Sequence, residues 1–158
     1  MEHLTAGGFS LIGLQLDRKT YNEGGQSGRD CGFLWQKFEK ENFYARIPGK
    51  LSDEVFAVYF DYEGDHTQPY SYFIGCRVDS AADVPEGMTS LHIPEDNYTR
   101  LTAHGRMPDC VAGKWNEIWE SQIGRRYTYD FEVYGETSKD WTNATVDILL
   151  SSSRASGN

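Results

Sequence analysis

Residues 56–65 read FAVYFDYEGD, and residues 127–136 read YTYDFEVYGE. At a constant offset the two segments align three pairs of residues: Phe60 with Phe131, Asp61 with Glu132, and Gly64 with Gly135. Each segment is rich in aromatic and β-branched residues and ends at a glycine turn, which is the pattern of a β-strand. A strand that recurs in the second half of a chain indicates an internal repeat, and such a repeat decides the architecture.

The segments before these two strands repeat as well. DCGFLWQKF (30–38) and DCVAGKWNEIW (109–119) place apolar residues at helical spacing. We therefore expect one helix with Asp30 as its N-cap and a second helix opened by Pro108 and Asp109. The expected strands are residues 9–18, 55–62 and 69–78 in the first half and residues 89–102 (interrupted by IPEDN), 127–134 and 145–151 in the second.

This order predicts an α+β fold with a pseudo-twofold tandem βαββ repeat. The sheet is expected to be largely antiparallel, with two helices on one face and a central ligand cleft between them. We expect a single domain over residues 1–158. Its expected parts are a first repeat at 9–78, a linker at 79–88, a second repeat at 89–151 and a disordered tail at 152–158.

The composition limits the classes of function. The formal net charge is −9, which argues against nucleic acid and against anionic membranes and favours positively charged ligands. Aromatic residues make up 14% of the chain. A tyrosine-rich sheet core explains such a surplus as well as an aromatic binding surface does.

Nothing in the sequence indicates secretion or a membrane anchor. There is no apolar run of roughly 20 residues and no signal peptide at residues 1–10. Cys31, Cys76 and Cys110 fit no zinc or disulfide pattern and indicate reduced thiols. We therefore expect a cytoplasmic protein without a cofactor or a metal.

Glu132 and Asp61 are the candidate charged groups of the cleft. Glu132 lies in mid-strand, where a charged residue buried without a partner is disfavoured, and Asp61 is its counterpart in the repeat. Either both carboxylates face solvent, or they face the groove, where a desolvated carboxylate would attract a cation. Residues 109–119 carry two tryptophans and residues 30–38 carry one. We therefore expect the ligand to lie toward the second half, and Glu132 to matter more than Asp61.

Strand alternation raises a difficulty for this assignment. It places Phe131 and Val133 on one face of the strand and Glu132 on the other, so that Glu132 points away from the apolar face. Three arrangements would reconcile the pattern with a cleft. Both faces of the sheet are covered, or the polar face is the pocket face, or a bulge shifts the register.

Aromatic side chains are the candidate walls of the cleft. Trp115 and Trp119 share one helix face and can stack on a planar ligand with cation–π attraction, whereas Trp35 is more simply explained as a core residue. Three tyrosines add walls with polar tips: Tyr59, Tyr72 and Tyr134. No catalytic motif accompanies them: the sequence has no G-x-S-x-G, no HExxH and no phosphate loop.

Taken together, these segments resemble the GyrI-like, or bacterial transcription-activator effector-binding, superfamily. The resemblance rests on the twofold βαββ unit and on VYFDYEGDHTQPYSYFIGCRV (58–78), DCVAGKWNEIW (109–119) and YDFEVY (129–134), in that order along the chain, and it covers residues 8–150. The chain is most similar to the integron-associated, stand-alone members. The resemblance implies a central cleft for hydrophobic drugs, with Glu132 meeting the positive charge of the ligand. Many members carry an N-terminal helix-turn-helix, for which there is no room before residue 9.

Three functions follow as hypotheses. The first is a binding module for bulky, planar, lipophilic cations, using Glu132, the aromatic residues and Asp61, with no catalytic residue. The second is a hydrolase of reactive natural products that uses the same cleft, with Glu132 as general base. The third is a module that sequesters a protein. The sequence does not indicate whether the chain has a DNA-binding partner or forms a homodimer.

Overall fold

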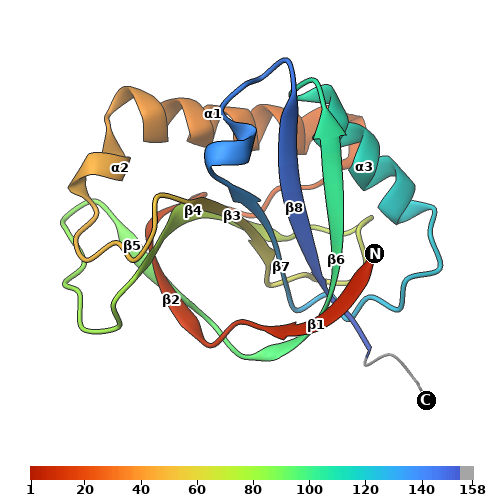
Figure 1. Cartoon of the computed structure of the whole chain (residues 1–158), viewed down its shortest axis with the longest axis horizontal. Helices are drawn as coiled ribbons and strands as arrows, with labels where there is room; N and C mark the ends of the chain where they lie inside the picture. The colour runs from red at the N-terminus through yellow and green to blue at the C-terminus, as the bar shows by residue number, and fades with distance from the viewer. Residues whose placement is uncertain (154–158) are drawn as a thin grey trace.

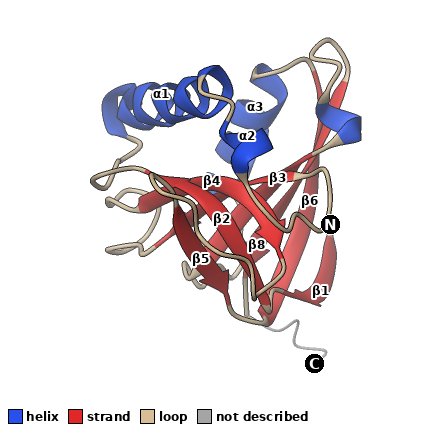
Figure 2. Cartoon of the chain, turned by 90° about the vertical axis from the view of Figure 1, so that its left-hand side faces the viewer, coloured by secondary structure: helices blue, strands red, loops and turns tan. Residues whose placement is uncertain are grey.

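The protein folds into one curled antiparallel sheet of eight strands with helices on one face (Figures 1 and 2). This computed structural model describes residues 1–153. The strands are β1 (Glu2–Ala6), β2 (Phe9–Gln15), β3 (Val55–Phe60), β4 (Ser71–Val78), β5 (Thr89–Ile93), β6 (Asp96–Gly105), β7 (Tyr129–Tyr134) and β8 (Ala144–Ser151). The helices are α1 (Gln26–Lys40), α2 (Phe43–Arg46) and α3 (Asp109–Trp119), with short 3-10 turns η1 (Glu23–Gly25) and η2 (Glu136–Ser138).

The strand order confirms the predicted pseudo-twofold α+β architecture. The order is β1-β6-β8-β7-β3-β4-β2-β5, so the four strands on one side of the centre match the four on the other in reverse order. The two repeats meet where β3 pairs with β7, with Ala57 opposite Glu132 and Val58 opposite Phe131. The strands that the sequence pairs by repetition are therefore neighbours at the centre of the sheet.

Two strands differ from the prediction. The segment at 89–102 is not one strand but two, because β5 and β6 are separated at Pro94 and Glu95. Proline lacks the N–H that a strand ladder requires. Strand β1, which was not predicted, adds to β6, while β5 adds to β2. Each repeat thus lends an edge strand to the other half of the sheet.

The start of α1 also differs from the prediction. The helix begins at Gln26, four residues before Asp30, so Asp30 is not its N-cap. The carboxylate of Asp30 instead accepts hydrogen bonds from the side chains of Thr20 (2.7 Å) and Gln26 (2.9 Å). At the other end of the chain, Ser152 is buried and pairs with Arg125 in an isolated bridge, so it is no part of a disordered tail. The rest of that predicted tail, 154–158, lies outside the described residues.

Apolar side chains cover both faces of the curled sheet. On the helix side, Leu34 and Phe38 of α1 pack on the first half, and α3 packs its i, i+4, i+7 stripe of Val111, Trp115 and Ile118 on the second. The other face forms a separate core cluster, centred on side chains such as Phe56, Val58, Phe73 and Phe131. Both faces of the sheet are therefore covered, which is one of the three arrangements that would reconcile the alternating pattern of β7 with a cleft around Glu132. No helix within residues 1–153 is both long and apolar enough to cross a membrane.

Candidate functional site

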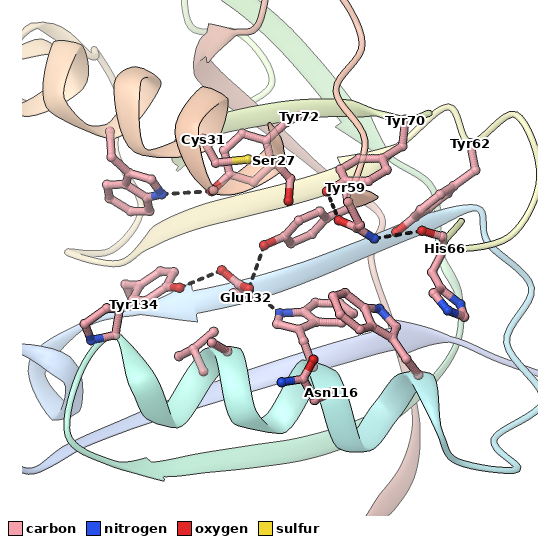
Figure 3. A pocket seen from close by; sticks show the side chains of 18 of the residues that line it. Ser27, Cys31, Tyr59, Tyr62, His66, Tyr70, Tyr72, Asn116, Glu132 and Tyr134 are labelled. Atoms are coloured by element: carbon pink, nitrogen blue, oxygen red, sulfur yellow. Dashed lines mark hydrogen bonds between the residues drawn. The ribbon is translucent and has the colours of Figure 1, made fainter. Parts of the chain in front are cut away.

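A cavity of 340 Å³ lies between α1, α3 and the centre of the sheet (Figure 3). Helix α1 contributes Cys31 and Trp35 to its wall, and α3 contributes Trp115 and Trp119. The floor comes from the central strands, which present four polar aromatic or acidic side chains: Tyr59, Tyr72, Glu132 and Tyr134. The two repeats therefore share one cavity where they meet.

Glu132 is the polar centre of this cavity. Its side chain is only 2% exposed. One carboxylate oxygen accepts hydrogen bonds from the indole N–H of Trp115 (2.6 Å) and the hydroxyl of Tyr59 (2.8 Å). The other oxygen accepts one from the hydroxyl of Tyr134 (2.6 Å), and Figure 3 shows Glu132 between Tyr59 and Tyr134. The polar face of β7 is thus the pocket face.

Burial dominates the acid–base properties of these groups. It raises the pKa of Glu132 above the ordinary value of a glutamate, although the three hydrogen bonds oppose this by favouring the carboxylate. Burial likewise raises the pKa of Tyr59 and of Tyr134 well above the ordinary tyrosine value, and the nearby Glu132 charge adds to the shift. Both tyrosines therefore keep their hydroxyl protons and remain donors to Glu132 at neutral pH.

The predicted aromatic walls come together around Glu132. The ring of Tyr59 lies 5.1 Å from that of Trp115 and 5.0 Å from that of Tyr72, measured between centroids. Trp35 packs edge-on against Tyr134 at 5.2 Å and donates its indole N–H to the hydroxyl of Tyr72 at 2.8 Å. Trp35 is therefore a wall of the cavity as well as a core contact.

Asp61 does not line this cavity, so the structure contradicts its prediction as a ligand-binding residue, and of the two arrangements left open for it the one that faces solvent holds. Strand β3 ends at Phe60, and Asp61 lies in the following turn with a φ of 52°. Its side chain is 65% exposed and lies 3.6 Å from the ammonium group of Lys19. The repeat preserves the residue type at this position, but the left-handed backbone turns it out of the sheet.

Four residues at the far end of the cavity were missed from the sequence: Tyr62, His66, Tyr70 and Arg125. The ring of His66 stacks on that of Trp119, with centroids 5.5 Å apart and planes inclined by 7°. Asn22 links this end of the cavity by donating to the backbone carbonyl of His66 and accepting from the hydroxyl of Tyr70. Tyr62 and Tyr70 could have been predicted to line a binding site, because aromatic residues are unusual in a solvent-exposed turn such as DYEGDHTQPY (61–70).

The cavity adjoins a wider groove of 1060 Å³ between α1 and the segment around η2. Four residues line both spaces: Trp35, Met107, Pro108 and Tyr134. Trp141, whose side chain is 60% exposed, stands in the outer groove. The packed rings of Trp35 and Tyr134 therefore form part of the wall that the two spaces share.

The described residues offer little for metal or nucleophilic chemistry. Residues 1–153 contain no group of three or more His, Cys, Asp or Glu side chains arranged to hold a metal ion. Cys31 lines the cavity, but burial raises its pKa far above the ordinary value of a thiol. It therefore stays a neutral thiol and packs as a small apolar side chain.

Comparison with known proteins gives one family. Residues 5–150 match the family model described as integron-associated effector binding protein. YobU of Bacillus subtilis is 25% identical over 121 residues, which cover 74% of this chain and 76% of YobU. The transcriptional regulator BrlR of Pseudomonas aeruginosa is 26% identical over 152 residues, which cover 90% of this chain and 51% of BrlR. The chain thus spans about half the length of that regulator.

Solved structures share the fold. The structure of SAV2435 bound to tetraphenylphosphonium superposes with a TM-score of 0.74 at 20% identity, covering 97% of this chain and 94% of that one. The integron cassette protein VCH_CASS2 of Vibrio cholerae superposes with a TM-score of 0.66 at 26% identity, covering 96% and 95%. The likeness to SAV2435, at its low identity, concerns the fold alone.

Proposed function

The chain belongs to the integron-associated effector-binding family, and we propose that it binds bulky, lipophilic organic cations in the cavity around Glu132. One observation carries the proposal. Glu132 is buried and ionisable, yet among residues 1–153 its carboxylate forms no ion pair and accepts only neutral hydrogen bonds. A buried carboxylate without a cation is costly, and a cationic ligand would supply the missing charge.

The walls suit such a ligand in size and chemistry. A volume of 340 Å³ falls within the range of small-molecule pockets, about 300–1,000 Å³. The faces of Trp115, Tyr59 and Tyr72 gather beside the carboxylate, and aromatic faces attract cations that have lost their water. The formal net charge of −9 draws positive ligands toward the protein.

The relatives support the same class of ligand. SAV2435, which shares the fold, has been solved with tetraphenylphosphonium, a large cation whose charge is surrounded by phenyl rings. BrlR is a transcriptional regulator, so related domains occur within regulators. We propose that this chain acts as a ligand-responsive module of that kind, and that its natural ligand is a small molecule rather than a nucleic acid.

We propose binding rather than catalysis for this cavity. Acid–base hydrolysis usually needs a second proton-transferring group beside the first. The side chains bonded to Glu132 are an indole and two tyrosines whose protons are held tightly by burial. Incubation with labile electrophiles and mass spectrometry would test this assignment. Turnover that disappears in Glu132→Gln would overturn it in favour of a hydrolase.

The charge of the ligand is expected to decide affinity. We expect crystal violet to bind with micromolar affinity and its uncharged leuco form, which has nearly the same size, to bind at least about tenfold more weakly. The quenching of tryptophan fluorescence measures both, because Trp115 and Trp119 line the cavity. Equal affinities for the two forms would contradict the role of the carboxylate.

The affinity for a cation is expected to fall as the pH falls. The raised pKa of Glu132 means that the carboxyl group takes up a proton at a higher pH than an ordinary glutamate does. The carboxylate attracts the cation more strongly than the protonated group does, so affinity should be constant above this pKa and fall below it until it levels off near the affinity of Glu132→Gln. Tetraphenylphosphonium is the suitable probe because it does not titrate. Calorimetric titrations between pH 8 and pH 5 measure the effect, with Glu132→Gln as the pH-independent control, and equal pH profiles for both proteins would count against it.

A further inference from the structure

Arg125 is a second polar group of the cavity, and its hydrogen bonds are incomplete. The side chain lines the cavity and is only 5% exposed. Its Nη2 donates to Asp130 at 2.7 Å. The other two nitrogens, Nε and Nη1, are buried and have no hydrogen-bond partner within residues 1–153. Buried N–H groups nearly always have a partner, so this pair points to an acceptor that residues 1–153 do not supply.

The charge of Arg125, by contrast, is already balanced. Asp130 is fully buried and pairs with the guanidinium, while also accepting hydrogen bonds from the hydroxyl of Tyr62 and from the backbone and hydroxyl of Ser151. The Arg125–Asp130 pair is therefore neutral as a unit. Its two unpartnered N–H groups have almost no accessible surface, so they lie behind the cavity wall, where a ligand reaches them once the side chains of the wall shift. The neutral pair does not repel a cationic ligand held elsewhere in the same space.

The guanidinium group of Arg125 and the carboxylate of Glu132 both lie beside the indole ring of Trp115. The N–H of Trp115 donates to Glu132, and the guanidinium carbon of Arg125 lies 5.6 Å from the Trp115 ring centroid. His66 adds one more incomplete group at this end of the cavity, because its Nδ1 is buried without a partner in the described chain. Figure 3 shows His66 and Tyr62 together at one end of the cavity, away from Tyr134.

From this arrangement we infer that the preferred ligands are cations that also carry an oxygen acceptor, either a carboxylate or a carbonyl. The cationic part would lie against Glu132 and the aromatic walls, and the oxygen would accept hydrogen bonds from Nε and Nη1 of Arg125. This inference rests on the proposed function and narrows its class of ligand from lipophilic cations in general to dipolar ones.

Two dyes with the same cationic ring system test the inference on the unaltered protein. Rhodamine B carries a carboxylate on its pendant phenyl ring, and tetraethylrosamine has hydrogen in its place. We expect rhodamine B to bind about tenfold more tightly than tetraethylrosamine, the gain expected of a charge-assisted hydrogen bond in a dry site. Fluorescence polarisation at neutral pH measures both affinities.

Arg125→Lys then tests the assignment to Arg125. Lysine keeps a positive charge near Asp130 but lacks the planar pair of N–H groups, so the tenfold ratio between the dyes should fall to about twofold or less. Arg126→Lys is the matched control and should keep the ratio, since Arg126 is partly exposed, pairs with Asp96 and does not line the cavity.

The outcomes separate the two proposals. If neither dye binds, the proposed function fails and this inference fails with it. If both dyes bind equally well, the proposed function stands and the inference is overturned. A ratio that survives in Arg125→Lys would show that another group recognises the carboxylate. The comparison in the unaltered protein needs no variant, so it remains decisive even if Arg125→Lys does not fold.

Discussion

Replacing Glu132 with Gln is expected to weaken the binding of tetraphenylphosphonium by about 1–3 kcal/mol, the range for losing a charged partner. This corresponds to a loss of affinity of roughly 5- to 150-fold. The reason is that Glu132 is the buried carboxylate of the cavity and is not neutralised by any cation of the described chain. Titration calorimetry at pH 7.5 measures the difference.

The variant should remain folded. A glutamine has the same shape, its oxygen can accept from Trp115 and Tyr59, and its NH₂ group can donate to the hydroxyl of Tyr134. The pKa of Glu132 is raised in the folded state, so the folded protein binds the proton more tightly than the unfolded chain does. The carboxylate therefore lowers the free energy of unfolding at pH above that pKa, and Glu132→Gln should melt at the same temperature or higher.

Asp61→Asn is the matched control for this experiment. It removes the same charge from the repeat counterpart, but Asp61 is exposed and lies outside the cavity beside Lys19. Its affinity for tetraphenylphosphonium should stay within about twofold of the unaltered protein, because exposed charges are screened by water and salt. Equal losses in the two variants would mean that net charge, and not the buried carboxylate, attracts the cation.

The repeat made much of this fold predictable. The helical stripe of Val111, Trp115 and Ile118 and the aromatic strands repeat in order, so the βαββ units and their pseudo-twofold arrangement follow from the sequence pattern. Strand β1 did not follow, because its five residues are largely exposed and it is fixed by pairing with β6, nearly a hundred residues away. Edge strands of this kind carry too little apolar pattern to be detected locally.

The sequence singles out Glu132 as a candidate site residue but does not predict which face of the sheet it occupies. Alternation fixes only that Glu132 and Phe131 lie on opposite faces of β7. The face of Phe131 is apolar, but the curl of the sheet and the helices above it bury the opposite face as well. The orientation of Asp61 could not be predicted from the repeat, because the repeat predicts only that the residue is acidic. The orientation depends on the left-handed backbone of the turn after β3, where Asp61 has a φ of 52°. Arg125 was not predicted as a site residue, because nothing in the sequence pattern indicates that its partner Asp130 is buried.

The largest effect on stability is expected from Asp130→Asn, which lies two residues before Glu132 on the same strand. Asp130 is fully buried and bonded to the guanidinium of Arg125, whose side chain is only 5% exposed. Removing the carboxylate leaves Arg125 as a buried cation without a counter-charge, which typically costs about 3–5 kcal/mol. Urea unfolding, monitored by tryptophan fluorescence without ligand, measures the loss.

A double variant separates the charge effect from general damage at this position. Arg125→Gln combined with Asp130→Asn removes both charges, so it should recover part of the stability lost in Asp130→Asn alone. A loss in Asp130→Asn no larger than that of the exposed Asp61→Asn would contradict the ion pair. The expected results differ between the two carboxylates of this strand: neutralising Asp130 lowers stability, whereas neutralising Glu132 leaves stability unchanged or raises it. Asp130 is neutralised by Arg125 of the same chain, so removing its charge is costly. Glu132 has no cationic partner among residues 1–153, so removing its charge should not lower stability, as expected of a carboxylate whose counter-charge comes from a ligand.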